Sequence, residues 1–215
     1  MCFVTGSGLM LQTTSPQKVL YLTGEASFSP ITPEGVWPIP PTDPPITIPG
    51  INEDGSHFPV EKIEAHVKGL HHQALSIFVF CQGELLIQQR AAEKYHCGGL
   101  WANTCCSHPH FGEDVADAAD RRLMEELGFL LPLEQRLIVE YSADVGNGLW
   151  ERERVHMFRT EIASKDQLAI ALNPEEVQAC RWVTCEALRE EIDAHPEIFT
   201  PWYRIYVKEY ARLDF

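Results

Sequence analysis

The chain of 215 residues contains no apolar run long enough to cross a membrane, and its start lacks the basic segment and continuous apolar stretch of a secretory signal. It has no Cys-x-x-Cys pair, and its seven cysteines are an odd number. These absences argue against a disulfide scaffold and a thioredoxin-like redox site. We therefore predict a soluble, cytoplasmic protein with reduced thiols.

Positive charge is also scarce. Seventeen Lys and Arg residues face 31 Asp and Glu residues, for a net charge of −14. This balance argues against a nucleic-acid partner, because proteins bind nucleic acids through a basic face. A small anionic ligand would have to be bound by a local cluster of cations. We predict a small-molecule partner, no membrane partner, and a monomer or homodimer.

The first 50 residues differ in composition from the rest. Eight of the 15 prolines lie between Pro30 and Pro49, which predicts an extended and poorly ordered N-terminal segment. The predicted domains are therefore a Pro-rich extension over residues 1–50 and one folded domain over residues 51–215.

The folded domain alternates strand and helix patterns. "ALSIFVFCQGELLIQQR" predicts two strands joined by a Gln-Gly turn, and "EDVADAADRRLMEELG" predicts a helix that Gly128 ends. Further strands are expected at residues 135–143, 154–162 and 176–184, and further helices at 185–195 and 201–213. Strands on both sides of a central helix favour a sheet covered on both faces.

The segment "NTCCSHPH", residues 103–110, holds two adjacent cysteines and two histidines. It could be a redox pair, a metal site, a nucleophile or a polar loop with buried thiols. The redox pair is the weakest reading, because adjacent cysteines need unusual geometry to bridge. The residues alone leave the other three open.

Several carboxylates and histidines could bind a metal. Glu151 and Glu153 are two apart, so on a strand they point to the same side, although a solvated strand edge is the simpler explanation of the pair alone. Arg122 and Glu126 share a helix face, where an ordinary surface ion pair is the simpler explanation. Histidines cluster in "HVKGLHH" and "CSHPH", which makes a divalent-metal site as good an explanation as ordinary loop residues.

A set of motifs runs in order from about Pro59 to the C-terminus: "LHHQALSIFVF", "LLIQQRAAEKYH", "GLWANTCCSHP", "RRLMEELG", "NGLWERE" and "FTPWYRIY". With these motifs the chain resembles the type I isopentenyl-diphosphate isomerases, and "NTCCSHP" is the most specific of them. The resemblance implies an α+β fold, a Nudix-like three-layer α-β-α sandwich with a mixed sheet.

The predicted helix also resembles part of a Nudix box. Glu113 fits the early Glu of that box and "LMEELG" fits its end. Arg122 stands where Nudix hydrolases have a magnesium-binding Glu, and Ser107 stands where the leading Gly belongs. The isomerases make the same Glu-to-Arg replacement.

The resemblance also implies roles for individual residues. The catalytic set is Cys106, Glu153, Tyr141 and Trp202. The contacts of the substrate diphosphate are Lys62, Arg90, Lys94 and Arg122. The ligands of a tightly bound metal, manganese or zinc, are His66, His72, His108, Glu151 and Glu153, and Glu126 is a ligand of magnesium that arrives with the substrate. His66 and His72 are one residue closer together than the corresponding pair in bacterial members.

The implied activity is conversion of isopentenyl diphosphate to dimethylallyl diphosphate in isoprenoid biosynthesis, by metal-dependent protonation and deprotonation through a carbocation. Two alternatives remain. A Nudix diphosphate hydrolase would need the Glu that Arg122 replaces. A non-catalytic, metal-stabilised binding module would not need Cys106, Glu153, Tyr141 and Trp202 together.

Overall fold

The computed structural model describes residues 45–209, so most of the predicted Pro-rich extension lies outside the described residues. The boundary expected at residue 51 stays a prediction, but the first strand, β1 (Thr47–Ile51), already begins before it. Among the described residues, no helix is both long and apolar enough to span a bilayer.

All nine strands of the described chain belong to one mixed sheet. The central strand β3 (His72–Cys81) pairs in parallel with β8 (Leu149–Ile162) and antiparallel with β4 (Glu84–Arg90) and β6 (Cys105–Ser107). Outside this centre, β7 (Glu134–Gly146) pairs with β8, and β9 (Val177–Thr184) and β5 (Trp101–Ala102) pair with β4. At the other edge, β1 pairs with β2 (His57–Glu61) and contacts the start of β3.

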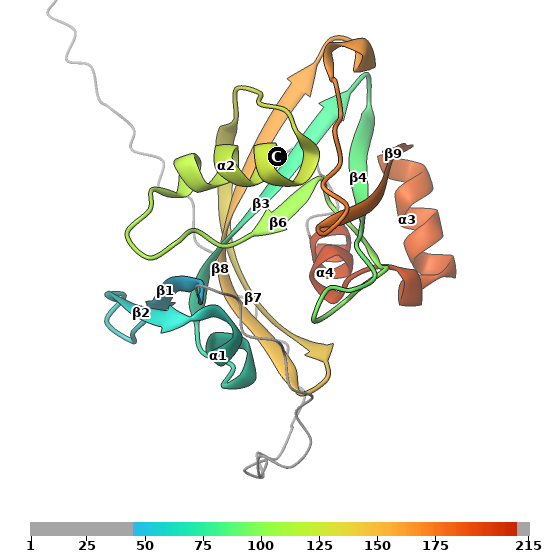
Figure 1. The fold of residues 1–215 in the computed structure, drawn as a ribbon. Coiled ribbons are helices and arrows are strands. Elements are labelled where there is room, and N and C mark those ends of the chain that lie inside the picture. Colours follow the sequence, from blue (N-terminus) through green and yellow to red (C-terminus); the bar gives the residue numbers. More distant parts are fainter. Residues whose placement is uncertain (1–44, 210–215) are drawn as a thin grey trace, which may run out of the picture.

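Helices cover both faces of the sheet, as Figure 1 shows. Every residue of β3 is buried, and its side chains alternate between two cores because successive residues of a strand point to opposite faces. Leu75, Ile77 and Val79 pack in the cluster that includes α2 (Val115–Leu127). Phe78 and Phe80 pack in the cluster that includes α3 (Cys185–Ala194) and α4 (Pro201–Glu209). The predicted three-layer sandwich is confirmed.

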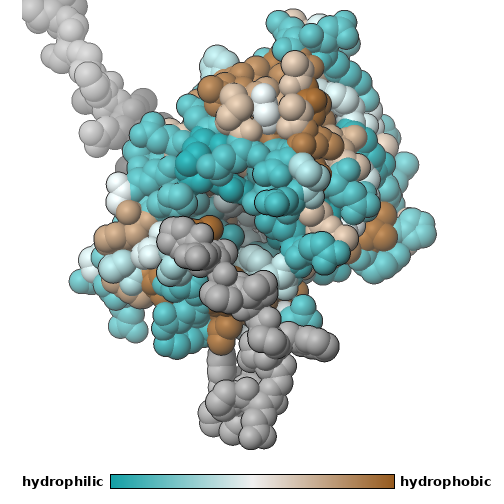
Figure 2. Space-filling model, in the orientation of Figure 1, coloured by the Kyte–Doolittle hydropathy of each residue, from teal (hydrophilic) through white to brown (hydrophobic). Residues whose placement is uncertain are grey.

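Helix α2 follows the predicted pattern. Asp114 accepts a hydrogen bond from the Ala116 amide at its start, and Gly128 ends it with a left-handed φ of 76°. Leu123 and Leu127 are fully buried, whereas the outer surface over α2 is hydrophilic (Figure 2). The predicted turn at Gln82-Gly83, the three later strands and helix α3 are also present; α4 is described only to Glu209.

The edge of the sheet next to α1 (Lys62–Val67) was not predicted. Strands β1 and β2 and helix α1 are five or six residues long, and the strands contain Pro49 and Pro59. Helix α1 places the side chains of Lys62 and His66, four residues apart, on one face. It thereby brings a cation and a histidine to the end of the sheet where β3 begins.

Candidate active site

Three neighbouring strands place polar side chains in one row. Strand β3 sets His72 beside Glu153 of β8, and β7 sets Tyr141 opposite the same Glu153. The Tyr141 hydroxyl lies 2.6 Å from Glu151 Oε2 and 2.7 Å from Glu153 Oε2. The two carboxylates are buried on one side of β8, as their spacing predicted.

Four buried residues could hold a metal ion together. Single ligand atoms of His66, His72, His108 and Glu153 all lie within 4.8 Å of one another. The Nδ1 atoms of His66 and His72 lie 2.6 Å and 2.7 Å from backbone carbonyls, which fixes the hydrogen on Nδ1 and leaves the Nε2 lone pair free. Both Nε2 atoms are buried without a hydrogen-bond partner. A divalent ion fits this donor set, because metal-binding histidines commonly donate their other N–H to a carbonyl.

Glu151 belongs to a second group rather than to these four. Its Oε1 lies 3.7 Å from His96 Nε2, and Glu151, His66 and His96 also have ligand atoms within 4.8 Å of one another. His96, which the sequence analysis did not single out, is buried and contacts the Trp202 ring edge-on at 5.9 Å. Nothing in the sequence around His96, which lies two residues after Lys94, predicted that it would contact Glu151 and Trp202.

The carboxyl groups of Glu151 and Glu153 have pKa values shifted in opposite directions. Burial and the neighbouring Glu153 charge raise the pKa of Glu151 well above its usual value. Burial opposes ionisation of Glu153 too, but the hydrogen bond from His108, with His72 Nε2 a further 3.4 Å contact, holds its pKa well below the usual value. Glu153 is therefore the ionised member of the pair, and His108 Nε2 lies 2.9 Å from its Oε1.

Cys106 lies directly beside the central strand, β3. Strand β6 pairs it directly with Ser76, whose Oγ lies 3.1 Å from the thiol, and the thiol donates to Asn103 Oδ1 at 2.7 Å. Burial raises the pKa of Cys106 to about 12, so it is a neutral thiol at pH 7. Cys105 points the other way, into the core under α2.

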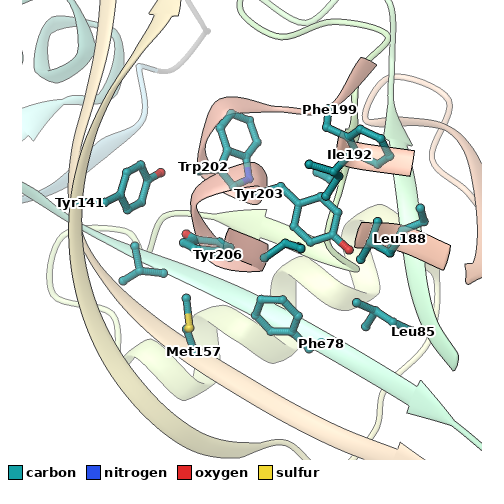
Figure 3. Packing of buried hydrophobic residues seen from close by; sticks show 14 of the residues in the cluster. Phe78, Leu85, Tyr141, Met157, Leu188, Ile192, Phe199, Trp202, Tyr203 and Tyr206 are labelled. Atoms are coloured by element: carbon teal, nitrogen blue, oxygen red, sulfur yellow. The ribbon is translucent and has the colours of Figure 1, made fainter. Parts of the chain in front are cut away.

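Aromatic side chains of α4 form the wall opposite Tyr141. Figure 3 shows Tyr141 on β7 facing the helix that carries Trp202, Tyr203 and Tyr206. The Tyr141 and Tyr206 rings meet edge-on at 5.7 Å, and the Tyr206 hydroxyl lies 3.2 Å from Ser76 Oγ. Trp202 is only 2% exposed, so this end of the site is apolar and shielded from water.

One pocket joins these groups to the predicted cations. Its empty space of about 440 Å³ includes open solvent at the mouth, and it is lined by Cys106, Tyr141, Glu151, Glu153 and Trp202 together with Lys62, Arg90, Lys94 and Arg122. Glu126 does not line the pocket; it lies behind Arg122, pairs with Arg122 Nη2 at 2.6 Å and accepts from Gln88. Glu176, which the sequence analysis did not single out, lies among the cations.

Known proteins resemble this chain over most of its length. The NUDIX domain model matches residues 70–203. An isopentenyl-diphosphate Delta-isomerase of Cereibacter sphaeroides is 52% identical over 163 residues, which cover 75% of this chain and 91% of the relative. The enzyme of the same name from Rhodobacter capsulatus is 49% identical, with 75% and 92% covered. The chain belongs to the isopentenyl-diphosphate Delta-isomerase family. The resemblance of the motifs is thereby confirmed.

Solved structures agree on the fold of this family member. The crystal structure of DR0079 from Deinococcus radiodurans superposes with a TM-score of 0.59 at 16% identity, covering 76% of this chain and 98% of that one. A MutT protein from Methanosarcina mazei gives a TM-score of 0.52, also at 16% identity, covering 67% and 95%. Membership of the isomerase family implies a divalent metal ion, which the free histidine Nε2 atoms fit.

Proposed function

We propose that this protein isomerises isopentenyl diphosphate to dimethylallyl diphosphate, a step of isoprenoid biosynthesis. The reaction adds a proton to the terminal carbon of the alkene and removes a proton from the carbon on the other side of the resulting tertiary cation. Two acid–base groups flanking the alkene are sufficient. Cys106, which holds a proton at neutral pH, and Glu153, which does not, are the proposed pair.

Tyr141 supports proton movement at Glu153. Its hydroxyl oxygen lies 2.6 Å from one carboxyl group and 2.7 Å from the other, so its single hydrogen can be donated to whichever of the two is ionised. Because a tertiary cation in water would be trapped as an alcohol, the reaction also needs a dry and π-rich wall. The buried Trp202 ring is the proposed source of that wall.

The diphosphate takes no part in the proton transfers. Lys62, Arg90, Lys94 and Arg122 line the pocket and are its proposed contacts, so the binding energy of a remote group holds the alkene in place. Glu126 is the proposed ligand for magnesium bound with the diphosphate. Manganese or zinc is proposed for the site of His66, His72, His108 and Glu153, with Glu151 completing it; such an ion would supply positive charge beside the carboxylates.

The observation that carries this proposal is the convergence, in one pocket, of a protonated thiol, an ionised carboxylate and four basic side chains. A hydrolase would not need a buried neutral thiol, and a binding module would not need the acid–base pair. Arg122 also occupies the position of the hydrolase Glu, and it lines the pocket.

The test is to incubate the purified protein with isopentenyl diphosphate and magnesium in deuterated water and to follow the product by NMR. We expect dimethylallyl diphosphate with deuterium in a methyl group. Release of phosphate would favour a hydrolase instead. Absence of both product and exchange, from a folded protein with its metal bound, would leave a binding module as the better conclusion.

A further inference from the structure

Glu176 places a carboxylate inside the proposed diphosphate site. It precedes β9 directly, and its carbonyl accepts from the Ala91 amide at 2.9 Å, next to Arg90. The Lys94 amide in turn donates to the Ala91 carbonyl at 3.2 Å. The backbone therefore fixes Glu176 against residues 90–94, the end of β4 and the loop after it, which carry Arg90 and Lys94.

The side chain of Glu176 pairs with two of these cations. Its Oε2 contacts Lys94 Nζ and lies 3.2 Å from Arg122 Nη2. Burial opposes the ionised form, but the charges of Arg122 and Lys94 lower the pKa of Glu176 to about 2. Glu176 is thus a fixed negative charge at neutral pH, and its side chain, still 22% exposed, lines the pocket.

The partners of Arg122 show why the negative charge of Glu176 matters for diphosphate binding. Arg122 Nη1 donates to Glu125 at 2.7 Å, and Nη2 is shared between Glu126 at 2.6 Å and Glu176 at 3.2 Å. Arg122 Nε is buried without a partner and cannot serve a ligand in the pocket without rearrangement. A diphosphate oxygen that approaches Arg122 must therefore compete with a carboxylate, and the contact with Glu176 is the longest of the three.

We propose that Glu176 is an internal counter-ion of the diphosphate site: it holds Lys94 and Arg122 in position without ligand and gives way to diphosphate oxygens when they bind. This role rests on the proposed function, since the anion is the diphosphate of that substrate class. Glu176 is a positioning residue, not a catalytic one. Its charge weakens diphosphate binding, which keeps the product from being held too tightly.

The experiment compares inorganic pyrophosphate binding by calorimetry, at saturating magnesium, in the wild-type protein, Glu176→Gln and Glu175→Gln. Glu175 is the exposed neighbour and controls for the loss of one charge from the chain. We expect Glu176→Gln to tighten pyrophosphate binding about tenfold, the scale of one partly screened charge at contact distance, and Glu175→Gln to change it less than about twofold. In turnover, KM should fall with kcat unchanged or lower.

Glu176→Asp keeps the charge and should bind pyrophosphate like the wild-type protein. Weaker or unchanged binding by Glu176→Gln, relative to Glu175→Gln, would overturn the counter-ion role and indicate a magnesium ligand or a purely structural residue. Wild-type protein that binds no pyrophosphate would overturn the diphosphate site and this role together. Pyrophosphate binding that tightens as expected, in a protein that makes no dimethylallyl diphosphate, would support the role of Glu176 and overturn only the isomerase proposal.

Discussion

At the scale of single residues, the environment of Cys106 separates it from the other thiols of the site region. Its Sγ has two hydrogen-bonding neighbours, Ser76 and Asn103, and lines the pocket, whereas Cys105 is buried in the apolar cluster below α2. Adjacent residues of one strand thus face a reactive pocket and a hydrophobic core. The alternation of strand β6 decides which cysteine can meet a substrate.

Replacement of Cys106 by Ala should lower turnover by about 10³-fold or more, because general acid–base groups contribute about 10²–10⁴-fold. Metal content, measured by elemental analysis, should not change, since Cys106 is not among the four grouped ligands. Cys105→Ala is the matched control: it should reduce stability while leaving turnover close to wild type. Near-normal turnover of Cys106→Ala would remove the thiol from the mechanism.

Lys62 gives a prediction about pH. Burial, together with the charges of Lys94 and Arg122, lowers the pKa of Lys62 to about 7, so the side chain is mostly neutral at pH 8. A bound diphosphate favours the charged form and raises this pKa again. Pyrophosphate binding at pH 8 should therefore take up nearly one more proton in the wild-type protein than in Lys62→Arg, whose guanidinium stays charged.

Calorimetry in two buffers of different ionisation enthalpy measures this proton uptake, and the ligand's own protonation cancels in the comparison of the two proteins. Below about pH 6 the difference should vanish, because Lys62 is then already protonated. Equal uptake at pH 8 would show that Lys62 does not face the diphosphate.

Site residues that belong to recognisable sequence motifs could be predicted, and isolated site residues could not. The spacing of Glu151 and Glu153 placed them on one side of a strand, and the family resemblance added Tyr141, which the structure sets opposite Glu153. His96 and Glu176 could not be predicted, because each depends on a loop meeting an element far away in the chain. A single carboxylate or histidine in a loop does not indicate which charge it will contact.

At the scale of elements, the end of α2 is fixed by close packing. Gly128 has a φ of 76°, and a Cβ there would lie 2.7 Å from Ala171 Cβ and 2.8 Å from Ala171 O. The Ala171 amide donates to the Leu127 carbonyl at 2.9 Å, which ties the segment before β9 to this helix end. The position of α2, and with it Arg122, thus depends on a glycine.

Gly128→Ala should lower the free energy of unfolding by about 2–3 kcal/mol, from the left-handed backbone and the steric clash together. Gly55, with a φ of 83° and nothing within 4 Å of its would-be Cβ, provides the control. Gly55→Ala should cost about 1 kcal/mol, the backbone contribution alone. Urea unfolding of both variants measures the difference; equal losses would mean that the Ala171 segment moves aside freely.

Elements with a long periodic pattern were predictable and short ones were not. The apolar stripe and the Gly stop predicted α2, and the continuous apolar run predicted β3. The six residues of α1 and the two of β5 are too few for a period to be visible, and their structure depends on contacts with the rest of the sheet.

At the scale of the whole molecule, the grouped histidines connect separate parts of the fold. His66 comes from α1, His72 from the start of β3, and His108 follows β6. Their rings lie 4.9–5.2 Å apart between centroids, with two Nε2 atoms buried and unpaired. A metal ion that satisfies these atoms binds the folded state and not the unfolded chain, so it should stabilise the protein as a whole.

Removal of metal by a chelator should therefore lower the melting temperature by about 5 °C or more, and re-addition of manganese or zinc should restore it. Scanning fluorimetry measures the shift. His66→Ala should abolish the metal-dependent part, whereas the control His110→Ala, whose side chain is 51% exposed, should retain it. A melting temperature that does not respond to the chelator would mean that the histidine group holds no ion.

The pairing of β3 with β8 has a consequence for how the chain is made. His72 of β3 pairs with Glu153 of β8. One edge of this fully buried strand therefore has no partner until β8, about 80 residues further along, has been synthesised. At about 5–20 residues per second on the ribosome, that partner arrives roughly 4–16 s later. During this interval an apolar strand edge is open to other chains. The strand that organises the pocket is thus also a segment of the nascent protein whose apolar edge stays unpaired until β8 is synthesised.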